Sequence, residues 1–173
     1  MLVCCGKENV NDRPSPEEPG KEEPKPEVNK PEICFKFDIE PYVIASSEDS
    51  VECAWTEGDA VGVYAYDAES DELVFCNKKL TFDGSNWVGD KLCWEKESLR
   101  FCAYYPFDEN NTDPTAISVN VKEDQSSEND YRLSDFLVAR NEEGVKIGSD
   151  VKLEFRHEFA MIQVEVPKSK YWN

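Results

Sequence analysis

Hydrophobic and charged residues alternate along the first half of residues 151–166, a pattern that predicts a β-strand with one buried face. Val151, Leu153 and Phe155 alternate with lysine, glutamate and arginine, and successive side chains of a strand point to opposite faces. In the second half the apolar residues follow the opposite parity. A strand changes parity only through an extra residue, a bulge or a bend. We therefore expect two core strand segments joined by a kink near residues 157–161.

Short runs of the same kind recur along the chain from residue 33, and helical periodicity is weak. Their connections are rich in Asp, Asn, Gly and Ser, which favour turns. Further strands are expected at residues 33–39, 60–66, 73–76, 79–82, 87–88, 91–94, 99–105, 116–121 and 136–139. Short strands at a spacing of roughly 8–12 residues are typical of sandwiches and barrels. We predict an all-β fold in which residues 33–173 form one β-sandwich domain.

Residues 7–32 have a different composition and are expected to lie outside the sandwich. They hold six of the ten prolines, are rich in Glu and Lys, and contain no aromatic residue. Such a segment cannot bury enough apolar surface to offset the entropy lost on ordering. We predict a disordered, extended Pro/Glu/Lys-rich tether, and the alternative is a disordered tail without a function.

The first six residues, MLVCCG, are similar to the end of a bacterial lipoprotein signal. In such signals a cysteine that follows small and apolar residues is acylated, and Cys5 fits this position with Leu2 three residues before it. The basic and apolar regions of a complete signal do not precede it. Either the sequence starts inside the signal, with Cys5 as the lipidation site, or the similarity is coincidental.

The charge balance argues against nucleic acid as a partner. Acidic residues outnumber basic ones 37 to 19, which gives a formal net charge of −18. Phosphate backbones and anionic membrane surfaces repel such a protein. No run reaches the roughly 20 apolar residues that a membrane span requires. The simplest interpretation of the acidity is solubility.

The cysteines of the domain are expected to be mostly unpaired. They are Cys34, Cys53, Cys76, Cys93 and Cys102, an odd number with no C-x-x-C pair. Three of them (Cys34, Cys76 and Cys102) lie in strand-like runs, where a free cysteine behaves as a small hydrophobic residue. One disulfide is the alternative.

No catalytic, metal or cofactor site is predicted, and we expect the protein not to be an enzyme. His157-Glu158 is similar to the start of the zinc-protease motif H-E-x-x-H, but Met161 stands where the second histidine is needed. His157, the single histidine, is therefore expected to be structural. The acidic loops 67–72 and 108–113 offer oxygen ligands for calcium but lack EF-hand spacing.

Aromatic residues offer one candidate ligand site. Trp55, Trp87 and Trp94, with Tyr104, would stack against sugar rings if two of them were exposed together. The alternative for each residue taken singly is packing in the core or in a hairpin.

Short motifs follow one another in a defined order along residues 33–166. They are W-x-x-G-D at 55–59 with V-G-V-Y at 61–64, F-D-G at 82–84, F-x-A-Y-Y-P at 101–106, D-Q-S at 124–126, S-D-F-L-x-A at 134–139 and L-x-F-x-H at 153–157. In this order the motifs resemble the N-terminal domain of the fimbrillin-like family of Bacteroidales, which contains major and minor fimbrial subunits.

The resemblance implies a transthyretin-like β-sandwich that is exported as an outer-membrane lipoprotein and serves as a subunit or anchor of cell-surface fimbriae. The expected partners are other fimbrial subunits, host or bacterial surface receptors, and the outer membrane through a lipid on Cys5. Family members usually continue into a second β-sandwich domain, whereas this chain stops at Asn173. They are often matured by cleavage after an arginine, and cleavage after Arg13 would remove only tether.

Two functions follow as hypotheses. In the first, the protein is a fimbrial or adhesin subunit whose partners add a strand at an open sheet edge, a mode of binding that uses backbone hydrogen bonds and leaves no catalytic signature. In the second, it is a carbohydrate-binding surface lipoprotein that uses its tryptophans and acidic loops.

Overall fold

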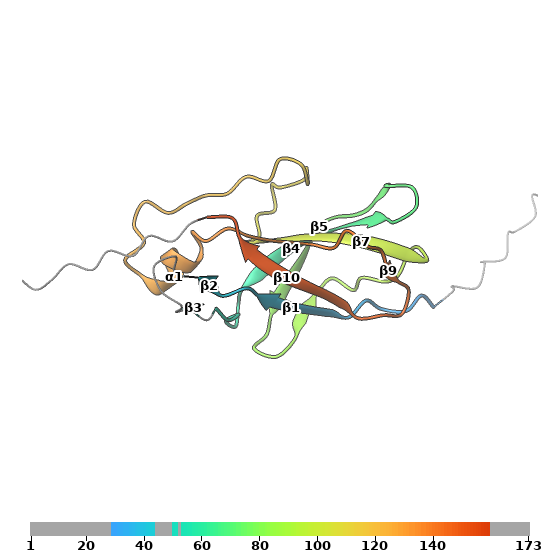
Figure 1. Ribbon diagram of the computed structural model, residues 1–173, viewed down its shortest axis with the longest axis horizontal. Helices are drawn as coiled ribbons and strands as arrows, with labels where there is room; N and C mark the ends of the chain where they lie inside the picture. The colour runs from blue at the N-terminus through green and yellow to red at the C-terminus, as the bar shows by residue number, and fades with distance from the viewer. Residues whose placement is uncertain (1–28, 44–49, 52, 160–173) are drawn as a thin grey trace, which may run out of the picture.

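The computed structural model describes residues 29–43, 50–51 and 53–159 and confirms an all-β fold with little helix (Figure 1). The elements are β1 (Phe35–Ile39), β2 (Tyr42–Val43), β3 (Ser50–Val51), β4 (Ala60–Asp67), β5 (Leu73–Phe82), β6 (Trp87–Gly89), β7 (Ser98–Tyr105), α1 (Glu128–Arg132), β8 (Leu137–Arg140), β9 (Val145–Lys146) and β10 (Val151–His157). Cys5, most of the predicted tether and the predicted strand segment after residue 160 lie outside the described residues.

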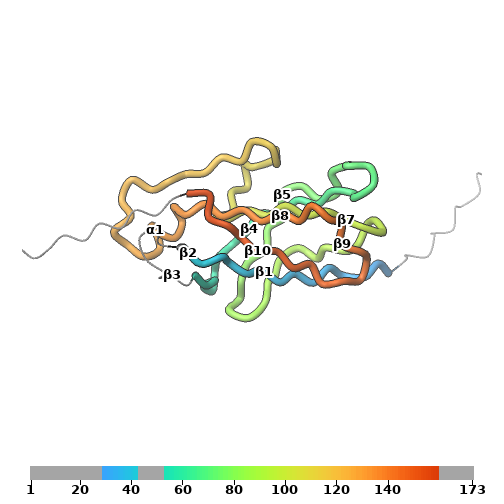
Figure 2. The backbone as a smooth tube through the Cα atoms, in the orientation of Figure 1, coloured from blue at the N-terminus to red at the C-terminus, as the bar shows by residue number. Residues whose placement is uncertain are grey.

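One curled sheet contains all of the strands except β2 and β3, which pair with each other. The strand order is β1-β10-β8-β7-β4-β5-β6, and β9 also pairs with β7. β10 joins the two layers, because residues 151–155 pair with β1 in parallel whereas Arg156 and His157 pair with β8 in antiparallel fashion. The sheet curls so that β1 lies across from β6 and β7, which completes the predicted sandwich (Figure 2).

The alternating pattern of β10 appears in the structure as predicted. Val151, Leu153 and Phe155 are buried, and the charged residues between them are exposed. The strand ends at His157, where the predicted kink region begins.

The core between the layers is rich in aromatic rings. Phe35 meets Phe101 edge to face, with centroids 5.7 Å apart. Phe37 contacts Trp87 at 4.9 Å and Phe155 at 5.4 Å. Burying a large apolar side chain stabilises a fold by about 1.5–3 kcal/mol, and tilted or edge-on ring pairs add to this. The rings therefore hold β1 against β6 and β7.

β7 is buried on both faces because the sheet is covered on both sides. One face of β7, which lies within the strand predicted at 99–105, points into the main core through Leu99, Phe101, Ala103 and Tyr105. The other face contributes to a second buried cluster. This cluster consists of Tyr64, Cys102, Tyr104 and Val138. A strand that packs on both faces is apolar at both parities.

The second cluster is covered by a long irregular segment, residues 107–127, and the prediction of a strand at 116–121 was wrong. Ile117 packs against the cluster. The side-chain amide of Asn111, which is 3% exposed, accepts from the Ser118 N–H at 2.9 Å and donates to the Ser118 carbonyl at 3.0 Å. The amide thus makes the backbone contacts that a neighbouring strand would make, so the alternating residues form no ladder.

Two further local predictions differ from the structure. The segment predicted as a loop at 124–130 contains the start of α1, whose first turn is capped by the Ser127 hydroxyl, an acceptor for the Asp130 N–H at 3.0 Å. Cys34, just before β1, and Cys76, on β5, are exposed rather than packed as small hydrophobic residues. Cys102 is buried as predicted, and burial raises the pKa of its thiol.

β5 was predicted as two short strands and is one strand with an irregularity at Asn77, whose φ is 44°. The Asn77 side chain is held by the chain around it, since its Nδ2 donates to the Asp108 carbonyl at 2.8 Å and its Oδ1 accepts from the Tyr104 hydroxyl at 2.9 Å. Gly62 on β4 leaves the space that this arrangement needs. A Cβ atom at residue 62 would lie 2.2 Å from Tyr104 Cε1 and 2.5 Å from Asn77 Oδ1.

Replacing Gly62 with alanine should destabilise the fold. The added methyl group must displace the Tyr104 ring and the Asn77 amide, and overpacking of this kind costs about 1–3 kcal/mol. Urea unfolding followed by tryptophan fluorescence measures the change in the free energy of unfolding. An unchanged midpoint would contradict the packing described for β4 and β5.

Candidate functional site

The sheet leaves one long strand edge uncovered, at β5. β4 pairs with β5 along most of its length, whereas β6 pairs only with Leu80–Phe82. In the part of the chain that the structure describes, no strand pairs with the outer edge of residues 73–79. An uncovered edge presents backbone N–H and C=O groups to which another strand can bind.

A groove of about 770 Å³ lies beside this edge, between residues 72–78 and residues 90–96. We call it the β5 groove. Its lining includes the buried side chains of Phe75 and Leu92 and the side chain of Leu73, which is 40% exposed. An extended peptide fits such a site, because its backbone pairs with the strand edge while alternate side chains contact the apolar lining.

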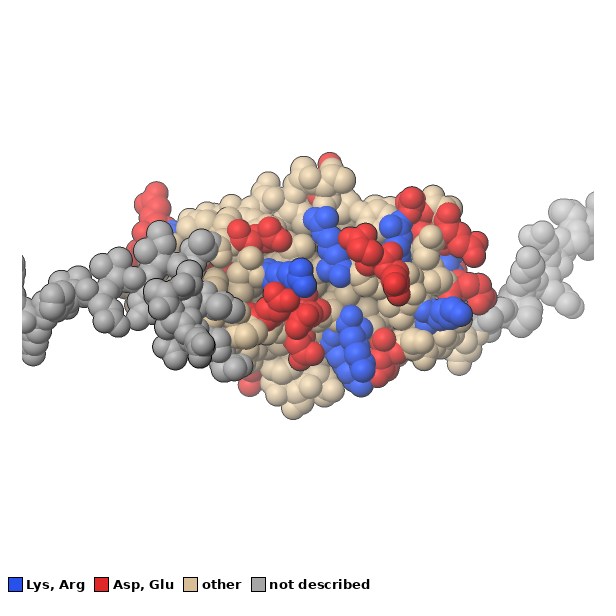
Figure 3. Space-filling model, viewed as in Figure 1, with Lys and Arg blue, Asp and Glu red and all other residues tan. Residues whose placement is uncertain are grey.

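The charged residues of the β5 groove have both signs. They are Lys78, Lys91, Lys96, Glu72, Asp90 and Glu95. The Lys96 Nζ lies 3.2 Å from carboxylate oxygens of both Glu72 and Asp67. On the face seen in Figure 3, acidic and basic side chains are likewise interspersed. The groove therefore has no strong preference for a partner of one charge.

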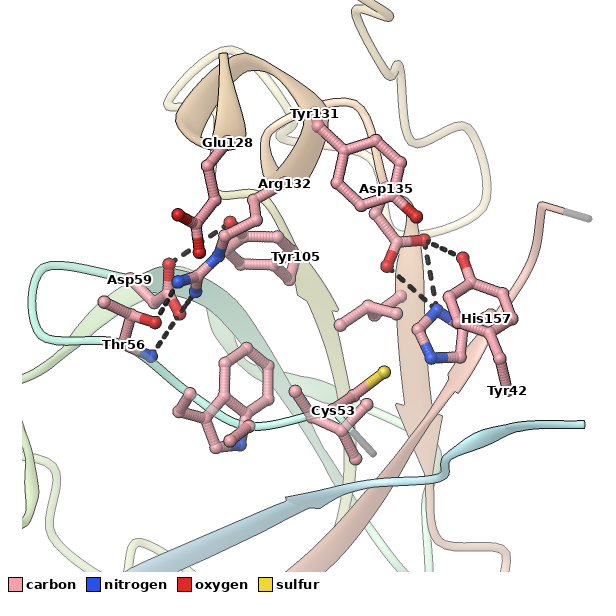
Figure 4. A pocket seen from close by; sticks show the side chains of 14 residues that line it. Tyr42, Cys53, Thr56, Asp59, Tyr105, Glu128, Tyr131, Arg132, Asp135 and His157 are labelled. Carbon is pink, nitrogen blue, oxygen red and sulfur yellow. Dashed lines mark hydrogen bonds and ion pairs between the residues drawn. The ribbon is translucent and has the colours of Figure 1, made fainter. Parts of the chain in front are cut away.

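A second cavity, of about 370 Å³, lies at the end of β10 next to α1 (Figure 4). Trp55 and Leu137 are among its apolar lining residues. Its polar side chains form two clusters, one around His157 and one around Arg132, on opposite sides of the view in Figure 4.

The first cluster joins β2, β10 and the residues before β8. His157 Nδ1 lies 2.9 Å from Asp135 Oδ2, and Nε2 lies 3.1 Å from the Glu40 carbonyl oxygen. The Tyr42 hydroxyl donates to Asp135 at 2.9 Å, and its ring stacks on the imidazole with centroids 3.6 Å apart. Burial and the bond to Asp135 raise the pKa of Tyr42, so its hydroxyl keeps the proton that it donates.

The second cluster joins α1 to the turn before β4. Arg132 forms an ion pair with Asp59 and a hydrogen bond to the Thr56 hydroxyl. Asp59 also accepts from the Thr56 N–H at 2.7 Å and from the Tyr105 hydroxyl at 3.2 Å. Burial, followed by the charge of Asp59, raises the pKa of Tyr105. Gly58, at φ 96°, lies in the turn before β4.

The polar atoms of both clusters bond mainly to one another, so the arrangement fits a structural role. It fastens β2 to the end of β10 through Asp135, and α1 to the turn before β4 through Arg132. The expectation that His157 is structural agrees with this geometry. The sequence analysis did not predict the contacts of either cluster. Tyr42 and Asp135 are 93 residues apart, and Arg132 and Asp59 are 73 residues apart. No local motif links such distant residues.

The three tryptophans predicted as a sugar-stacking surface all pack in or against the main core. Trp94 is 1% exposed and therefore offers no ring face to a ligand. Trp55 and Trp87 are partly buried and meet edge to face, with centroids 4.9 Å apart. Tyr104 is buried in the apolar cluster that it forms with Tyr64, Cys102 and Val138.

The acidic loops use their carboxylates locally. Asp67 accepts from the Glu69 N–H and the Ser70 hydroxyl, and Asp113 accepts from Thr115. Among the described residues, no three His, Cys, Asp or Glu side chains converge as a metal site would require. The same residues include no helix long and apolar enough to cross a membrane.

With this geometry in hand, the family can be assigned. The profile of the fimbrillin-like family matches residues 46–173, which is most of the chain. The chain therefore belongs to the fimbrillin-like family, as the order of its motifs predicted.

Individual relatives agree with the assignment. A Bacteroides ovatus protein named as a fimbrium tip subunit, Fim1C, is 25% identical over 134 residues, which cover 68% of this chain and 25% of that protein. Two crystal structures of Bacteroides ovatus proteins share the fold. One is of a fimbrial protein (TM-score 0.55, 18% identity, 74% of this chain, 28% of that one). The other is of a protein described as a cell adhesion protein (TM-score 0.57, 19% identity, 74% and 52%).

The chain thus spans between a quarter and about half of the length of these relatives.

The Asp135 cluster predicts a measurable contribution to stability. In Asp135→Asn, two donors (Tyr42 and His157) lose a charged acceptor, and unsatisfied buried groups cost about 1–3 kcal/mol. Asp150→Asn is the matched control, because Asp150 pairs with Lys36 at the surface, where water screens an ion pair and its contribution to stability is small. Urea unfolding at neutral pH should separate the two variants. Equal losses would show that the cluster does not fasten β10.

Proposed function

We propose that this protein is a cell-surface fimbrial or adhesin subunit, or an anchor for one, that joins its partners by strand addition at the β5 groove. The observation that carries the proposal is the uncovered edge of residues 73–79 beside a groove whose lining combines charged side chains with apolar ones, among them the exposed Leu73. Family membership supports assembly with other subunits, and the groove supplies a place where an extended segment of a partner would bind.

Strand addition suits the chemistry of this edge. Backbone groups of β5 would form hydrogen bonds with the partner strand, each of which contributes about 0.5–1.5 kcal/mol net. Specificity would come from alternate side chains that contact Leu73, Phe75 and Leu92. The pairing of β5 with β4 shifts register near Asn77 and again between Phe75 and Leu73. A partner strand would therefore pair with short stretches of the edge, mainly within residues 73–76.

We further propose that a lipid on Cys5 anchors the protein in the outer membrane. The support is the MLVCC start and the proline-rich segment that follows it, which would hold the sandwich away from the membrane as an extended spacer. Cys5 lies outside the described residues, so this proposal depends on the sequence.

Carbohydrate binding was the alternative function. The burial of Trp94, together with the edge-to-face contact between the partly buried Trp55 and Trp87, argues against the stacking surface on which this function depended. The local use of the Asp67 and Asp113 carboxylates argues in the same direction. The strand-addition proposal is therefore preferred.

Hydrogen–deuterium exchange tests the edge directly. Assemblies containing this protein would be isolated from the surface of producing cells and compared with the purified free chain. We expect the amides of residues 73–76 to exchange at least about tenfold more slowly in the assembly, since new backbone hydrogen bonds protect them. Equal exchange of these amides in both samples would refute strand addition at β5.

A matched pair of substitutions strengthens the test. Leu73→Lys places a charge in the β5 groove, whereas Val88→Lys places the same charge on β6, at a residue that is 47% exposed and outside the groove lining. Both residues are exposed, so neither change should unfold the sandwich. We expect Leu73→Lys to lower incorporation into surface assemblies about tenfold or more and Val88→Lys to leave it near the parent level. Equal incorporation of both variants would exclude the groove.

The lipid anchor has a separate test. Cells producing the parent or Cys5→Ala would be labelled with a palmitate analogue, and we expect labelling of the parent alone. Cys4→Ala is the matched control and should still be labelled. Labelling of the Cys5→Ala variant at the parent level would remove Cys5 from the proposal.

A further inference from the structure

The other end of the sheet, at β1, has an edge of its own, and backbone alternation defines which residues face it. The Val151 N–H donates to the Cys34 carbonyl and the Glu40 N–H donates to the Phe155 carbonyl, both at 2.8 Å. Even-numbered residues of this stretch therefore direct their backbone groups toward β10, and odd-numbered residues direct theirs away from it. The residues of β1 whose backbone N–H and C=O groups point away from β10 are Phe35, Phe37 and Ile39.

Just before β1, this outer side is already paired. The Ile33 N–H donates to the Leu92 carbonyl at 2.8 Å, and the Trp94 N–H donates to the Pro31 carbonyl at 2.9 Å. Glu32 and Cys93 face each other in an antiparallel bridge. Residues 92–94, after β6, thus pair with residues 31–33. They leave the outward backbone groups of β1 itself without a strand partner among the described residues.

A tryptophan side chain closes the middle of β1. The Trp55 Nε1–H donates to the Phe37 carbonyl at 2.9 Å, which is one of the outward backbone groups. The indole is held in place by edge-on contacts with Trp87, Phe155 and Tyr105, at centroid distances of 4.9, 5.1 and 5.6 Å. Its N–H is therefore aimed at β1 by packing on three sides.

We infer that Trp55 is a specificity-determining residue that closes the β1 edge to incoming strands and so leaves β5 as the docking edge. A strand that added to β1 would need the Phe37 carbonyl as an acceptor and the space beside it, and the indole occupies both. Proteins commonly cover sheet edges to prevent unwanted edge-to-edge pairing. The inference rests on the proposed function in one respect, namely that strands add to this sheet.

The occupant that Trp55 excludes is a second copy of this chain. Two β1 edges can meet in antiparallel orientation about a two-fold axis, because the same outward groups of each copy serve as donors and acceptors for the other. Centred on Phe37, such a pairing would place the two Phe37 residues opposite each other as a hydrogen-bonded pair. The indole at Phe37 blocks this register in both copies at once.

Trp55→Phe tests the inference, because phenylalanine retains a packed ring and lacks the N–H. Sedimentation equilibrium of the purified chain should show the parent as a monomer and the variant self-associating at least about tenfold more tightly. Trp94→Phe is the matched control, since it replaces another buried indole, whose ring contacts Phe101 rather than Trp55, and it should sediment like the parent. Circular dichroism would establish that each variant is folded.

A folded Trp55→Phe variant that sediments like the parent would overturn the inference, and so would equal self-association of the two tryptophan variants. A fall in stability without self-association would likewise reduce Trp55 to a packing residue. In the parent, the Trp55 indole N–H should exchange slowly with solvent, and rapid exchange would show that the bond to Phe37 does not persist. Self-association of Trp55→Phe together with unchanged incorporation of Leu73→Lys would refute the β5 proposal alone.

Discussion

The pairing of β10 with two different strands is the interaction on which the molecule depends. Its first residues pair with β1, which comes from the start of the domain, and its last two pair with β8 in the other layer. Parallel pairing of strands so distant in sequence requires a long connection, here the whole of the intervening domain. The alternation of Val151, Leu153 and Phe155 then aims one face of β10 into the core.

This arrangement buries both faces of the central strands. The main core lies between the layers. On the other side of the sheet, residues 107–127 cover the apolar cluster around Tyr64 and Tyr104. A sheet covered in this way offers few large surfaces to a partner, so its edges become the natural places for contact. The two edges are not equivalent: β5 is open along residues 73–79, whereas Trp55 and the chain around Cys93 close β1.

The cavity beside α1 illustrates a different use of polar residues. His157, Asp135 and Tyr42 form one set of contacts, and Arg132 with Asp59 forms the other. Polar groups that are partly withdrawn from water need partners, and here each set supplies its own. The polar residues that line the cavity therefore stabilise the junction of several chain segments, and the proposed place of assembly is the β5 edge instead.

Local patterns in the sequence determined the fold class, most strands, the buried face of β10 and the family, because alternation and turn chemistry act between near neighbours. They failed at residues 116–121, where the Asn111 amide replaces a partner strand. They also failed for Cys34 and Cys76, whose exposure depends on what packs over each strand. The contacts of Trp55 and Asp135, and the openness of the β5 edge, were decided only by the tertiary structure. All of these features depend on which distant segments of the chain come together, and a local sequence pattern carries no information about that.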